Sequence, residues 1–291
     1  MKKRIRRGVY VLATLLLLCG GSVYATDTFI NTNGVSMTET QANKIDTIFS
    51  EGYSKYISQN EFDKYIDAEI VSSDIKYSKS TYKNGEFVSE EEVTREEFEN
   101  STLTSTESES CKESTGNRNY SDTVTTNYKS LNTTVIVQSG NYSMVNVLHW
   151  TQVPKYRSYD VFAFYLSNFS YYNVAGSQVY YNTSGSGSYN YNSSSAGYKS
   201  SSVGAGISMN LKDGSNITGY YLSLTANLTA GNSSHGTTYV SYQHAKTDLT
   251  RAQSMSYTFS LSGLGNVVYY SSPTLMNSYD GMSGTIVYVP F

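Results

Sequence analysis

Cysteine is scarce in this sequence, and its scarcity limits how the folded chain can be held together. Only Cys19 and Cys111 occur among the 291 residues. Cys19 lies in a segment that we expect to be removed, so the remaining chain keeps one thiol and no intrachain disulfide can form. About 266 residues then remain, enough to bury the core of one large or two smaller domains. Folding must therefore depend on a hydrophobic core.

The start of the chain lacks an apolar run long enough to cross a membrane. The Leu-rich run at residues 9–18 has about ten residues, whereas a membrane-spanning helix needs about 20. This run follows five basic residues within residues 2–7 and precedes Val23-Tyr24-Ala25, which ends in a small residue. That order is typical of a secretory signal peptide. We therefore expect cleavage near Ala25 and secretion of the mature protein.

Cys19 raises an alternative, because a lipoprotein signal also ends at a cysteine. The residue before that cysteine is normally small, whereas here it is Leu18, which follows two further leucines. We therefore favour ordinary secretion over lipid anchoring.

Glutamate is absent from the second part of the chain, and charge divides the sequence into two unlike parts. Residues 26–119 contain 19 Asp and Glu against 9 Lys and Arg, a formal charge of −10. Residues 120–291 contain 5 Asp, no Glu and 7 Lys and Arg, a formal charge of +2. Residues 101–119 have few apolar side chains, which predicts a linker. The predicted organisation is a signal peptide at 1–25, a small acidic α+β region at 26–100, the linker at 101–119 and a Tyr/Ser/Thr-rich domain at 120–291.

Clustered basic residues are missing from the mature chain, which argues against nucleic acid as a partner. The acidic balance also argues against electrostatic docking on anionic lipid. Glutamate runs occur at residues 90–92 and 96–97, but no Asp-x-Asp-x-Asp-Gly loop surrounds them. We interpret them as a solvated face rather than a calcium site. No metal and no cofactor are expected.

Two capping boxes predict a small helical hairpin near the start of the mature chain. Ser36 with Glu39, and Ser58 with Glu61, have the spacing at which each side chain satisfies a free amide at a helix start. Apolar residues follow both boxes at helical spacing, and Gly52 is placed to end the first helix.

A β-hairpin and one more helical turn are predicted after these helices. Asn84-Gly85 is a strong two-residue turn signal between two short extended stretches. Residues 94–97 predict a further helical turn. We expect this α-hairpin and β-hairpin region to pack against the larger domain.

Polar and apolar residues alternate through most of the chain from residue 120 onward. Strands are predicted at residues 120–138, 142–153, 159–166, 178–182, 202–211, 217–229, 237–245, 255–261, 266–271 and 285–290, and a helical turn at 275–279. The alternation is clearest at residues 220–229, where even-numbered positions are mostly apolar. One apolar and one polar face predict an antiparallel β-sandwich. The Ser/Gly-rich residues 181–202 predict a long surface loop or a weakly paired edge.

Motifs for catalysis and metal binding are missing. The histidines His149, His235 and His244 share no metal-ligand spacing, and the chain has no His-Glu-x-x-His. The turn at residues 231–236 lacks the Gly-x-Ser-x-Gly spacing of a nucleophile elbow. Cys111 lies in the polar linker, a poor place to activate a thiolate. We therefore expect no enzymatic activity and assign no catalytic residue and no metal ligand.

An extracellular hydrolase is kept as an alternative, because carboxylates that are distant in sequence can meet in space. The predicted β-sandwich domain contains Asp122, Asp160, Asp213, Asp248 and Asp280. Asp213 is interpreted as a turn residue. Two of the other four would have to come together to hydrolyse a glycosidic bond.

Trp150 and His244 are the positions that stand out within the predicted strands. Trp150 is the only tryptophan and lies in mid-strand, which favours a role in the core. His244 shares one strand face with Val240 and Tyr242, which favours a structural histidine with satisfied hydrogen bonds.

Several short segments resemble those of known proteins. They are Val147-Leu148-His149-Trp150 continuing to Pro154, Arg157-Ser158-Tyr159-Asp160-Val161, Ser241-Tyr242-Gln243-His244-Ala245, Tyr279-Asp280-Gly281-Met282 and Ser58-Gln59-Asn60-Glu61-Phe62. In these segments the chain resembles uncharacterised secreted proteins of Gram-positive bacteria. The resemblance covers most of the mature chain and implies secretion, but it assigns no activity and no site residues.

Tyrosine is abundant, with 29 residues, and its abundance beside the missing catalytic groups suggests binding. We expect a secreted, non-enzymatic extracellular or cell-surface binding protein. The ligand would be a glycan, a wall polymer or a protein. The predicted contact residues are Tyr171, Tyr172, Tyr180, Tyr189 and Tyr191.

A membrane-active, pore-forming protein is the second alternative. Residues 207–229 alternate apolar and polar side chains and carry little charge around a short turn, as the inserted hairpins of pore formers do. An ordinary sandwich strand shows the same pattern, so membrane contact is not favoured.

Overall fold

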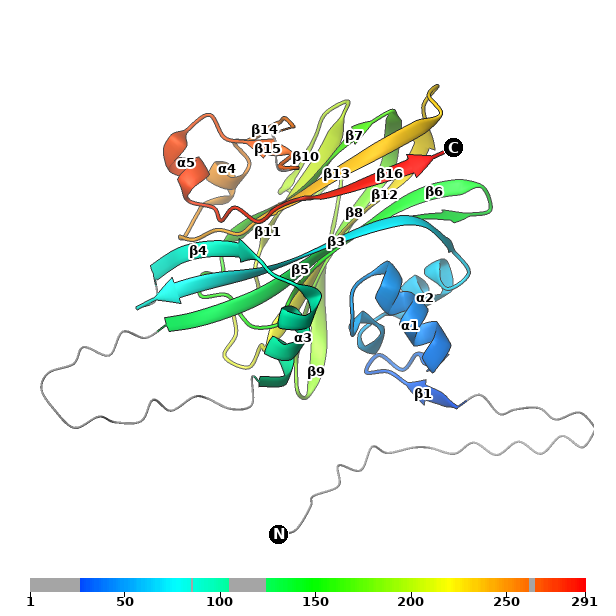
Figure 1. The fold of residues 1–291 in the computed structure, drawn as a ribbon, viewed down its shortest axis with the longest axis horizontal. Helices are drawn as coiled ribbons and strands as arrows, with labels where there is room; N and C mark the ends of the chain where they lie inside the picture. Colours follow the sequence, from blue (N-terminus) through cyan, green and yellow to red (C-terminus); the bar gives the residue numbers. More distant parts are fainter. Residues whose placement is uncertain (1–26, 85, 105–123, 262–264) are drawn as a thin grey trace, which may run out of the picture.

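Two antiparallel sheets pack face to face and enclose the main hydrophobic core (Figure 1). The computed structural model describes residues 27–84, 86–104, 124–261 and 265–291. Most of its elements are strands, which confirms the predicted mainly β, antiparallel β-sandwich fold. The predicted signal peptide, Gly85 and residues 105–119 of the predicted linker lie outside the described residues.

The larger sheet has seven strands in the order β4-β3-β5-β6-β12-β8-β9. They are β3 (Glu69–Lys83), β4 (Glu86–Glu92), β5 (Val124–Gln138), β6 (Asn141–Trp150), β8 (Phe169–Asn182), β9 (Gly185–Asn192) and β12 (Gly219–Ala230). The predicted hairpin is β3–β4, and β3 also pairs with β5 along almost its whole length. Since β3 precedes the predicted linker and β5 follows it, one sheet contains strands from both parts that the charge pattern separates.

The smaller sheet has five strands in the order β10-β11-β7-β13-β16. They are β7 (Tyr159–Ser167), β10 (Tyr198–Ser200), β11 (Gly204–Asn210), β13 (His235–Gln243) and β16 (Thr285–Pro290). Residues 181–202, predicted as a long loop or a weakly paired edge, contain β9 and β10, which are edge strands of the two sheets. The loop prediction was wrong and the edge prediction is confirmed, because both strands pair with only one neighbour.

Residues 207–229, predicted as an amphipathic hairpin, do not form one in this structure. β11 pairs with β7 and β10, whereas β12 pairs with β6 and β8 in the opposite sheet. Ile207 and Met209 of β11 and Leu222 and Leu224 of β12 belong to the same buried cluster between the sheets. The alternation therefore reflects two strands that face one core from opposite sides.

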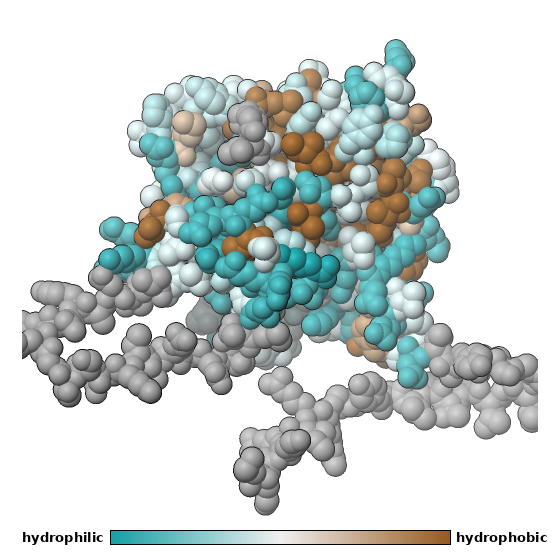
Figure 2. Space-filling model, in the orientation of Figure 1, coloured by the Kyte–Doolittle hydropathy of each residue, from teal (hydrophilic) through white to brown (hydrophobic). Residues whose placement is uncertain are grey.

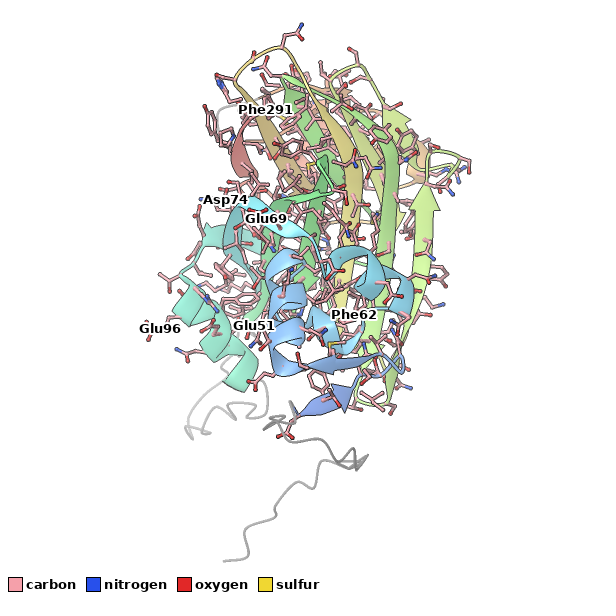
Figure 3. All side chains as sticks on the ribbon, turned by 90° about the vertical axis from the view of Figure 1, so that its right-hand side faces the viewer. Glu51, Phe62, Glu69, Asp74, Glu96 and Phe291 are labelled. Atoms are coloured by element: carbon pink, nitrogen blue, oxygen red, sulfur yellow. The ribbon has the colours of Figure 1, made fainter. Side chains whose placement is uncertain are left out.

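A helical layer covers the outer face of the seven-stranded sheet (Figures 1 and 3). It comprises the short ladder of β1 (Thr28–Ile30) and β2 (Ser36–Thr38), then α1 (Glu39–Ile48), the 3-10 turn η1 (Tyr53–Lys55) and α2 (Gln59–Tyr65). Ile45 of α1 and Phe62 of α2 are buried in one cluster with Val145 and Val147 of β6 and Val179 of β8. The predicted helical hairpin is confirmed.

The start of α2 has the predicted capping box. The Ser58 hydroxyl accepts a hydrogen bond from the Glu61 backbone N–H at 3.4 Å, and the Glu61 carboxylate accepts one from the Ser58 N–H at 3.2 Å. Gly52, predicted to end the first helix, has a left-handed backbone with φ of 78° and precedes η1.

The capping box predicted at Ser36 and Glu39 was wrong by two residues. Thr38 and Gln41 form the box at the start of α1. Ser36 instead pairs with Ile30 in the β1–β2 ladder, so its backbone is already committed to a strand before the helix begins.

The turn predicted at residues 94–97 is the start of a longer helix, α3 (Arg95–Thr104). Phe98 is buried, with its ring 4.9 Å from that of Tyr77 and 6.3 Å from that of His149. Glu96 points into solvent (Figure 3), and the acidic side chains of β4 and α3 give this part of the surface a hydrophilic cover (Figure 2). The first residues of the predicted linker, 101–104, are therefore helical.

A second small layer covers the outer face of the five-stranded sheet. It contains α4 (Arg251–Ser254), β14 (Thr258–Phe259), β15 (Val268–Tyr269) and α5 (Pro273–Asn277). Tyr257 and Val267 are buried there with Val161 and Ala163 of β7. The strands predicted at 255–261 and 266–271 are reduced to two-residue strands, and α4 was not predicted.

His149 lies where the helical layer meets the sheet, and its surroundings favour the neutral ring. Its Nε2 is 2.9 Å from the Tyr181 hydroxyl, and its ring stacks on Tyr221 with 4.1 Å between centroids. Burial, with a smaller contribution from Lys55, lowers the pKa of His149 from 6.5 to about 3. The unfolded chain therefore accepts a proton below pH 6.5 that the folded protein excludes.

We expect the free energy of unfolding to fall as the pH drops from 6.5 toward 3, in part because of His149. A group whose pKa is lower in the folded state stabilises the fold above its unfolded pKa and loses this effect as the pH falls toward the folded pKa. The loss from His149 alone should be on the order of 3 kcal/mol by pH 4. The free energy of unfolding, measured in urea between pH 7 and 4, should fall less steeply for His149→Gln than for wild type.

The control for this experiment is His235→Gln, because His235 is partly exposed. It should follow the wild-type decline. If the free energy of unfolding falls equally steeply with pH in wild type and His149→Gln, the lowered pKa of His149 is contradicted.

Candidate functional site

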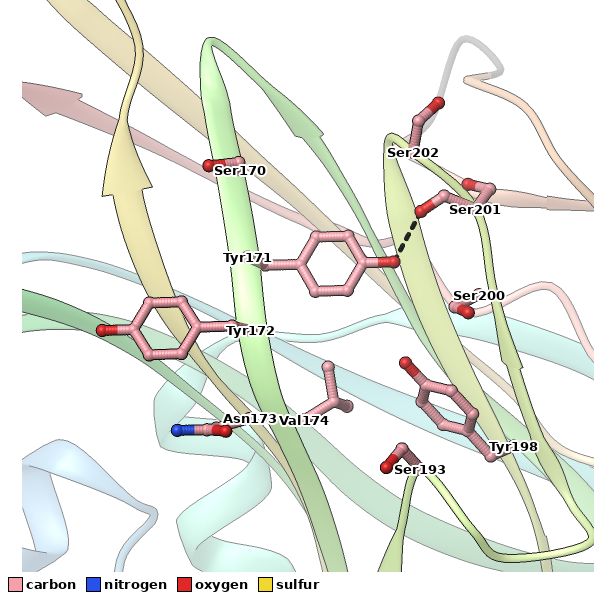
Figure 4. A pocket seen from close by; sticks show the side chains of 10 residues that line it. All are labelled: Ser170, Tyr171, Tyr172, Asn173, Val174, Ser193, Tyr198, Ser200, Ser201 and Ser202. Atoms are coloured by element: carbon pink, nitrogen blue, oxygen red, sulfur yellow. Dashed lines mark hydrogen bonds between the residues drawn. The ribbon is translucent and has the colours of Figure 1, made fainter.

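A cleft of about 390 Å³ opens between β8 and the turn that joins β10 to β11 (Figure 4). Its lining residues are Ser170, Tyr171, Tyr172, Asn173, Val174, Ser193, Tyr198, Ser200, Ser201 and Ser202. All are uncharged, and every one except Val174 carries a hydroxyl or amide group. The volume lies within the range of small-molecule sites.

The backbone of β8 is irregular beside this cleft. Tyr172 pairs with Asn227 and Ala175 pairs with Thr225, so two residues of β8 oppose one residue of β12. Asn173 lies inside this bulge with a left-handed φ of 52°, which asparagine tolerates better than most residues. β9 pairs with β8 only beyond the bulge. The bulge therefore marks the point where β8 leaves one edge open to the cleft.

Tyr171 fixes one wall of the cleft. Its hydroxyl donates to the carbonyl oxygens of Ser201 at 2.6 Å and Gly204 at 2.8 Å, and its ring meets that of Phe164 edge-on at 5.1 Å. Burial raises the pKa of the Tyr171 hydroxyl above its ordinary value, so the group remains a donor. Tyr171 thus ties the seven-stranded sheet to the β10–β11 turn and sets the width of the cleft.

The other two tyrosines of the cleft differ in orientation. Tyr172 points to the side of β8 opposite to Tyr171 (Figure 4) and is 45 % exposed, so it lies at the rim. Tyr198 comes from β10, packs partly against the core and faces Val174 (Figure 4). Tyr198 therefore presents the aromatic surface inside the cleft, and the exposed hydroxyls of Ser200 and Ser202 lie along the same side.

The remaining predicted contact residues lie elsewhere, near the far end of β8 and on β9. The rings of Tyr180 and Tyr189 are 5.8 Å apart, and the Tyr191 hydroxyl accepts a hydrogen bond from Gln178 Nε2 at 3.3 Å. Tyr180 and Tyr191 pack against the core, whereas Tyr189 is 44 % exposed. The structure therefore divides the predicted set: two of the five residues line the cleft and three form a separate cluster.

A second groove, of about 350 Å³, lies between the helical layer and the β8–β9 hairpin. Its lining residues are Asn33, Tyr56, Ser58, Glu61, Ser177, Val179, Ser186, Gly187, Ser188 and Asn190. The Glu61 carboxylate already accepts hydrogen bonds from Tyr53 and Ser58. This groove was not predicted, because its two walls come from segments more than a hundred residues apart in the sequence.

Two of the aspartates kept for the hydrolase alternative do come together, at His244. The Asp160 carboxylate accepts hydrogen bonds from His244 Nδ1 at 3.0 Å, from the Ala245 N–H at 2.9 Å and from the Tyr242 hydroxyl. The Asp280 carboxylate accepts one from the His244 backbone N–H at 2.9 Å. Both aspartates are buried. Their carboxylates therefore accept hydrogen bonds from groups within the fold and are not accessible to a substrate.

Trp150 and His244 have the structural roles predicted for them. Trp150 is fully buried, and its Nε1 donates to the Tyr242 hydroxyl at 2.9 Å. His244 is also fully buried and bonded through Nδ1 to Asp160, while its Nε2 has no hydrogen-bond partner among the described residues. The prediction of a fully satisfied histidine is therefore correct for one ring nitrogen only.

Lys129 completes this buried cluster and was not predicted from the sequence. Its Nζ forms ion pairs with Asp280 and with Glu90, the latter at 3.1 Å, and lies 4.7 Å from the centre of the Trp150 ring. The Glu90 side chain is only 7 % exposed, so the prediction that the run at 90–92 is solvated was wrong for this residue. Glu91 and Glu92 are more than half exposed, as predicted.

A signal for this cluster was present in the sequence. Lys129 lies two and six residues from Leu131 and Val135, so the three side chains share the face of the strand that points into the core. A lysine at that position of an alternating strand needs a buried counter-charge.

Neither a metal centre nor a membrane-spanning helix is found in the part of the chain that the structure describes. No group of three or more His, Cys, Asp or Glu side chains within residues 27–84, 86–104, 124–261 and 265–291 is placed to hold a metal ion. The helices of the same ranges are too short or too polar to cross a membrane.

Comparison with known proteins gives no family assignment. No protein-family model matches the chain, and no curated protein matches it significantly.

Asn173 should be sensitive to β-branched substitution, because its left-handed backbone shapes the bulge. Asn173→Val should lower the free energy of unfolding by about 1–2 kcal/mol, since valine rarely adopts a positive φ. Asn173→Gly, which removes the side chain but tolerates this φ, should stay within about 0.5 kcal/mol of wild type. Urea unfolding of the three proteins measures the difference. Equal destabilisation by both substitutions would show that the side chain, and not the backbone, matters here.

Proposed function

We propose that this protein is an extracellular binding protein that recognises a neutral carbohydrate in the cleft beside β8. The observation that carries the proposal is the composition of that cleft, which has serine, asparagine and tyrosine groups and no charged lining residue. The signal-peptide pattern of residues 1–25 supports an extracellular location.

The chemistry of the lining matches a neutral, polyhydroxylated ligand. Serine hydroxyls and the asparagine amide both donate and accept hydrogen bonds, so they can pair with sugar hydroxyls in either direction. The Tyr198 ring adds a flat apolar surface at small entropic cost, as tyrosine does in other binding surfaces. An anionic ligand would leave its charge unpaired against this lining, which argues for a neutral one.

The cleft is also held open by the fold, which favours binding. Tyr171 of β8 bonds to two carbonyl oxygens of the β10–β11 segment and so holds the two walls together. The bulge at Asn173 fixes the backbone of the β8 wall. A binding surface that is already ordered loses less conformational entropy when the ligand arrives.

The two alternatives gain no support from this geometry. The aspartates that meet at His244 are buried and bonded. The strands proposed for membrane insertion, β11 and β12, belong to opposite sheets.

Filling the cleft should abolish binding without disturbing the core. Ser200 is exposed and lines the cleft, so Ser200→Trp places a bulky side chain in the ligand space. We expect wild type to bind at least one member of a panel of neutral oligosaccharides in titration calorimetry. Ser200→Trp should weaken that binding by a factor of about ten or more, which corresponds to roughly 1.4 kcal/mol.

The matched control is Ser271→Trp, which makes the same substitution at an exposed serine outside the cleft. It should bind like wild type. Binding that Ser200→Trp leaves unchanged, or binding of charged ligands only, would overturn the proposal.

A further inference from the structure

Lys129 and Asp280 form the most deeply buried pair of opposite charges among the described residues. Both side chains have 0 % exposure and are in direct contact, although they lie 151 positions apart in the chain. Glu90, a third ionisable group, lies on the same ammonium at 3.1 Å and is 7 % exposed. Burying an ion pair rarely stabilises a fold relative to apolar packing, and the proposed binding function uses none of these groups.

We propose that Lys129 Nζ and Asp280 Cγ are joined by an amide, an intramolecular isopeptide bond, and that Glu90 is the acid–base group for its formation. This inference is independent of the carbohydrate proposal. It rests on the placement of an amine, a carboxyl group and a second carboxyl group within one enclosed site.

The two oxygens of Asp280 have different surroundings, and the difference fits amide formation. Lys129 Nζ lies against Oδ2, whereas Oδ1 accepts a hydrogen bond from the His244 backbone N–H at 2.9 Å. The amine can therefore replace Oδ2 with little movement. The His244 N–H would stabilise the negative charge that develops on Oδ1 when Cγ becomes tetrahedral.

The surroundings of the amine also favour reaction. Nζ lies 4.7 Å from the Trp150 ring centre and 5.9 Å from that of Tyr242, so bulk water has no access from that side. Burial alone would lower the pKa of the Lys129 ammonium, but Asp280 and Glu90 more than offset it and the pKa lies above its ordinary value. A nearby base must therefore remove a proton before the amine can attack, and Glu90 is in place to do so.

The step balances without any further reactant. Glu90 takes one proton from the ammonium and passes it to Oδ2 of Asp280, which leaves a neutral amine beside a neutral carboxylic acid. The Nζ lone pair then attacks Cγ and forms the N–Cγ bond of a tetrahedral intermediate. Glu90 takes a second proton from the nitrogen of this intermediate and delivers it to Oδ2, which leaves as water when the Cγ–Oδ2 bond breaks. An ammonium and a carboxylate are thus converted into one neutral amide and one water molecule, with Glu90 restored as a carboxylate.

A route for the water molecule lies next to Glu90. A small pocket of about 40 Å³ is lined by Glu90, Ser78 and residues 281–283, directly after Asp280 in the chain. It is large enough for a water molecule and opens beside the acidic strand β4.

Mass spectrometry of the intact, denatured protein tests the proposal directly. Wild type should be lighter than its sequence mass by one water molecule, and a protease digest should contain a branched peptide that joins the segments around Lys129 and Asp280. Lys129→Arg, which keeps the positive charge but has no ε-amine, should have its full sequence mass and only linear peptides. Folded wild-type protein with its full mass and linear peptides would overturn the proposal, whether or not any variant folds.

Two further variants test the assigned atoms. Asp280→Asn should lose ammonia rather than water if its side-chain carbonyl carbon is attacked, whereas a loss of water from this variant would place the bond at another residue and overturn the assignment. Glu90→Gln keeps the shape of the side chain but has no acid–base group, so its bond should form about 100-fold more slowly or not at all. Wild-type bond formation in Glu90→Gln would overturn the role assigned to Glu90.

Discussion

The burial of the Lys129 amine between carboxyl groups is the constraint on which the arrangement of the two sheets depends. A lysine inside a sandwich requires carboxylates beside it, and here they come from two distant segments, Glu90 on β4 and Asp280 just before β16. Lys129 Nζ also lies over the ring of Trp150, whose Nε1 donates to Tyr242 of the opposite sheet. One chain of polar contacts therefore crosses the core, and it fixes how the acidic hairpin, the seven-stranded sheet and the five-stranded sheet lie against one another.

The fold class could be predicted because its main signal is local. Alternation along residues 220–229 has the period of a strand with one apolar face, and Leu222 and Leu224 do lie in the core between the sheets. The opposite face is not exposed at Tyr221 and Ser223, because the helical layer buries this part of β12 as well. The capping box at Ser58 is equally local. Which strands are neighbours is not local information, so the same alternation led to a hairpin at 207–229 although its strands lie in opposite sheets. Ser36 was misplaced for a similar reason, since its pairing with Ile30 outweighs its capping preference.

The candidate site was predicted only in part, and strand geometry explains which part. Tyr171 and Tyr172 are adjacent in sequence but point to opposite faces of β8, so a count of tyrosines could not define one surface. The serines of the cleft come from β8, from β10 and from the turns on either side of β10, which only the fold brings together. The burial of Lys129 could be predicted, because it lies on the same face of its strand as Leu131 and Val135. Its partners Glu90 and Asp280 could be found only by knowing the topology.

The composition of the two edge strands of the seven-stranded sheet has a consequence for behaviour in concentrated solution. β4 is one edge and is dominated by glutamate, while β9 is the other and contains only glycine, serine, tyrosine and asparagine. Unpaired edges invite strands of neighbouring molecules, and like charges or weakly hydrophobic sequences discourage such pairing. The acidic segment that resembles a separate module in the sequence thus opposes edge-to-edge aggregation by charge repulsion. This repulsion weakens as salt screens the glutamates.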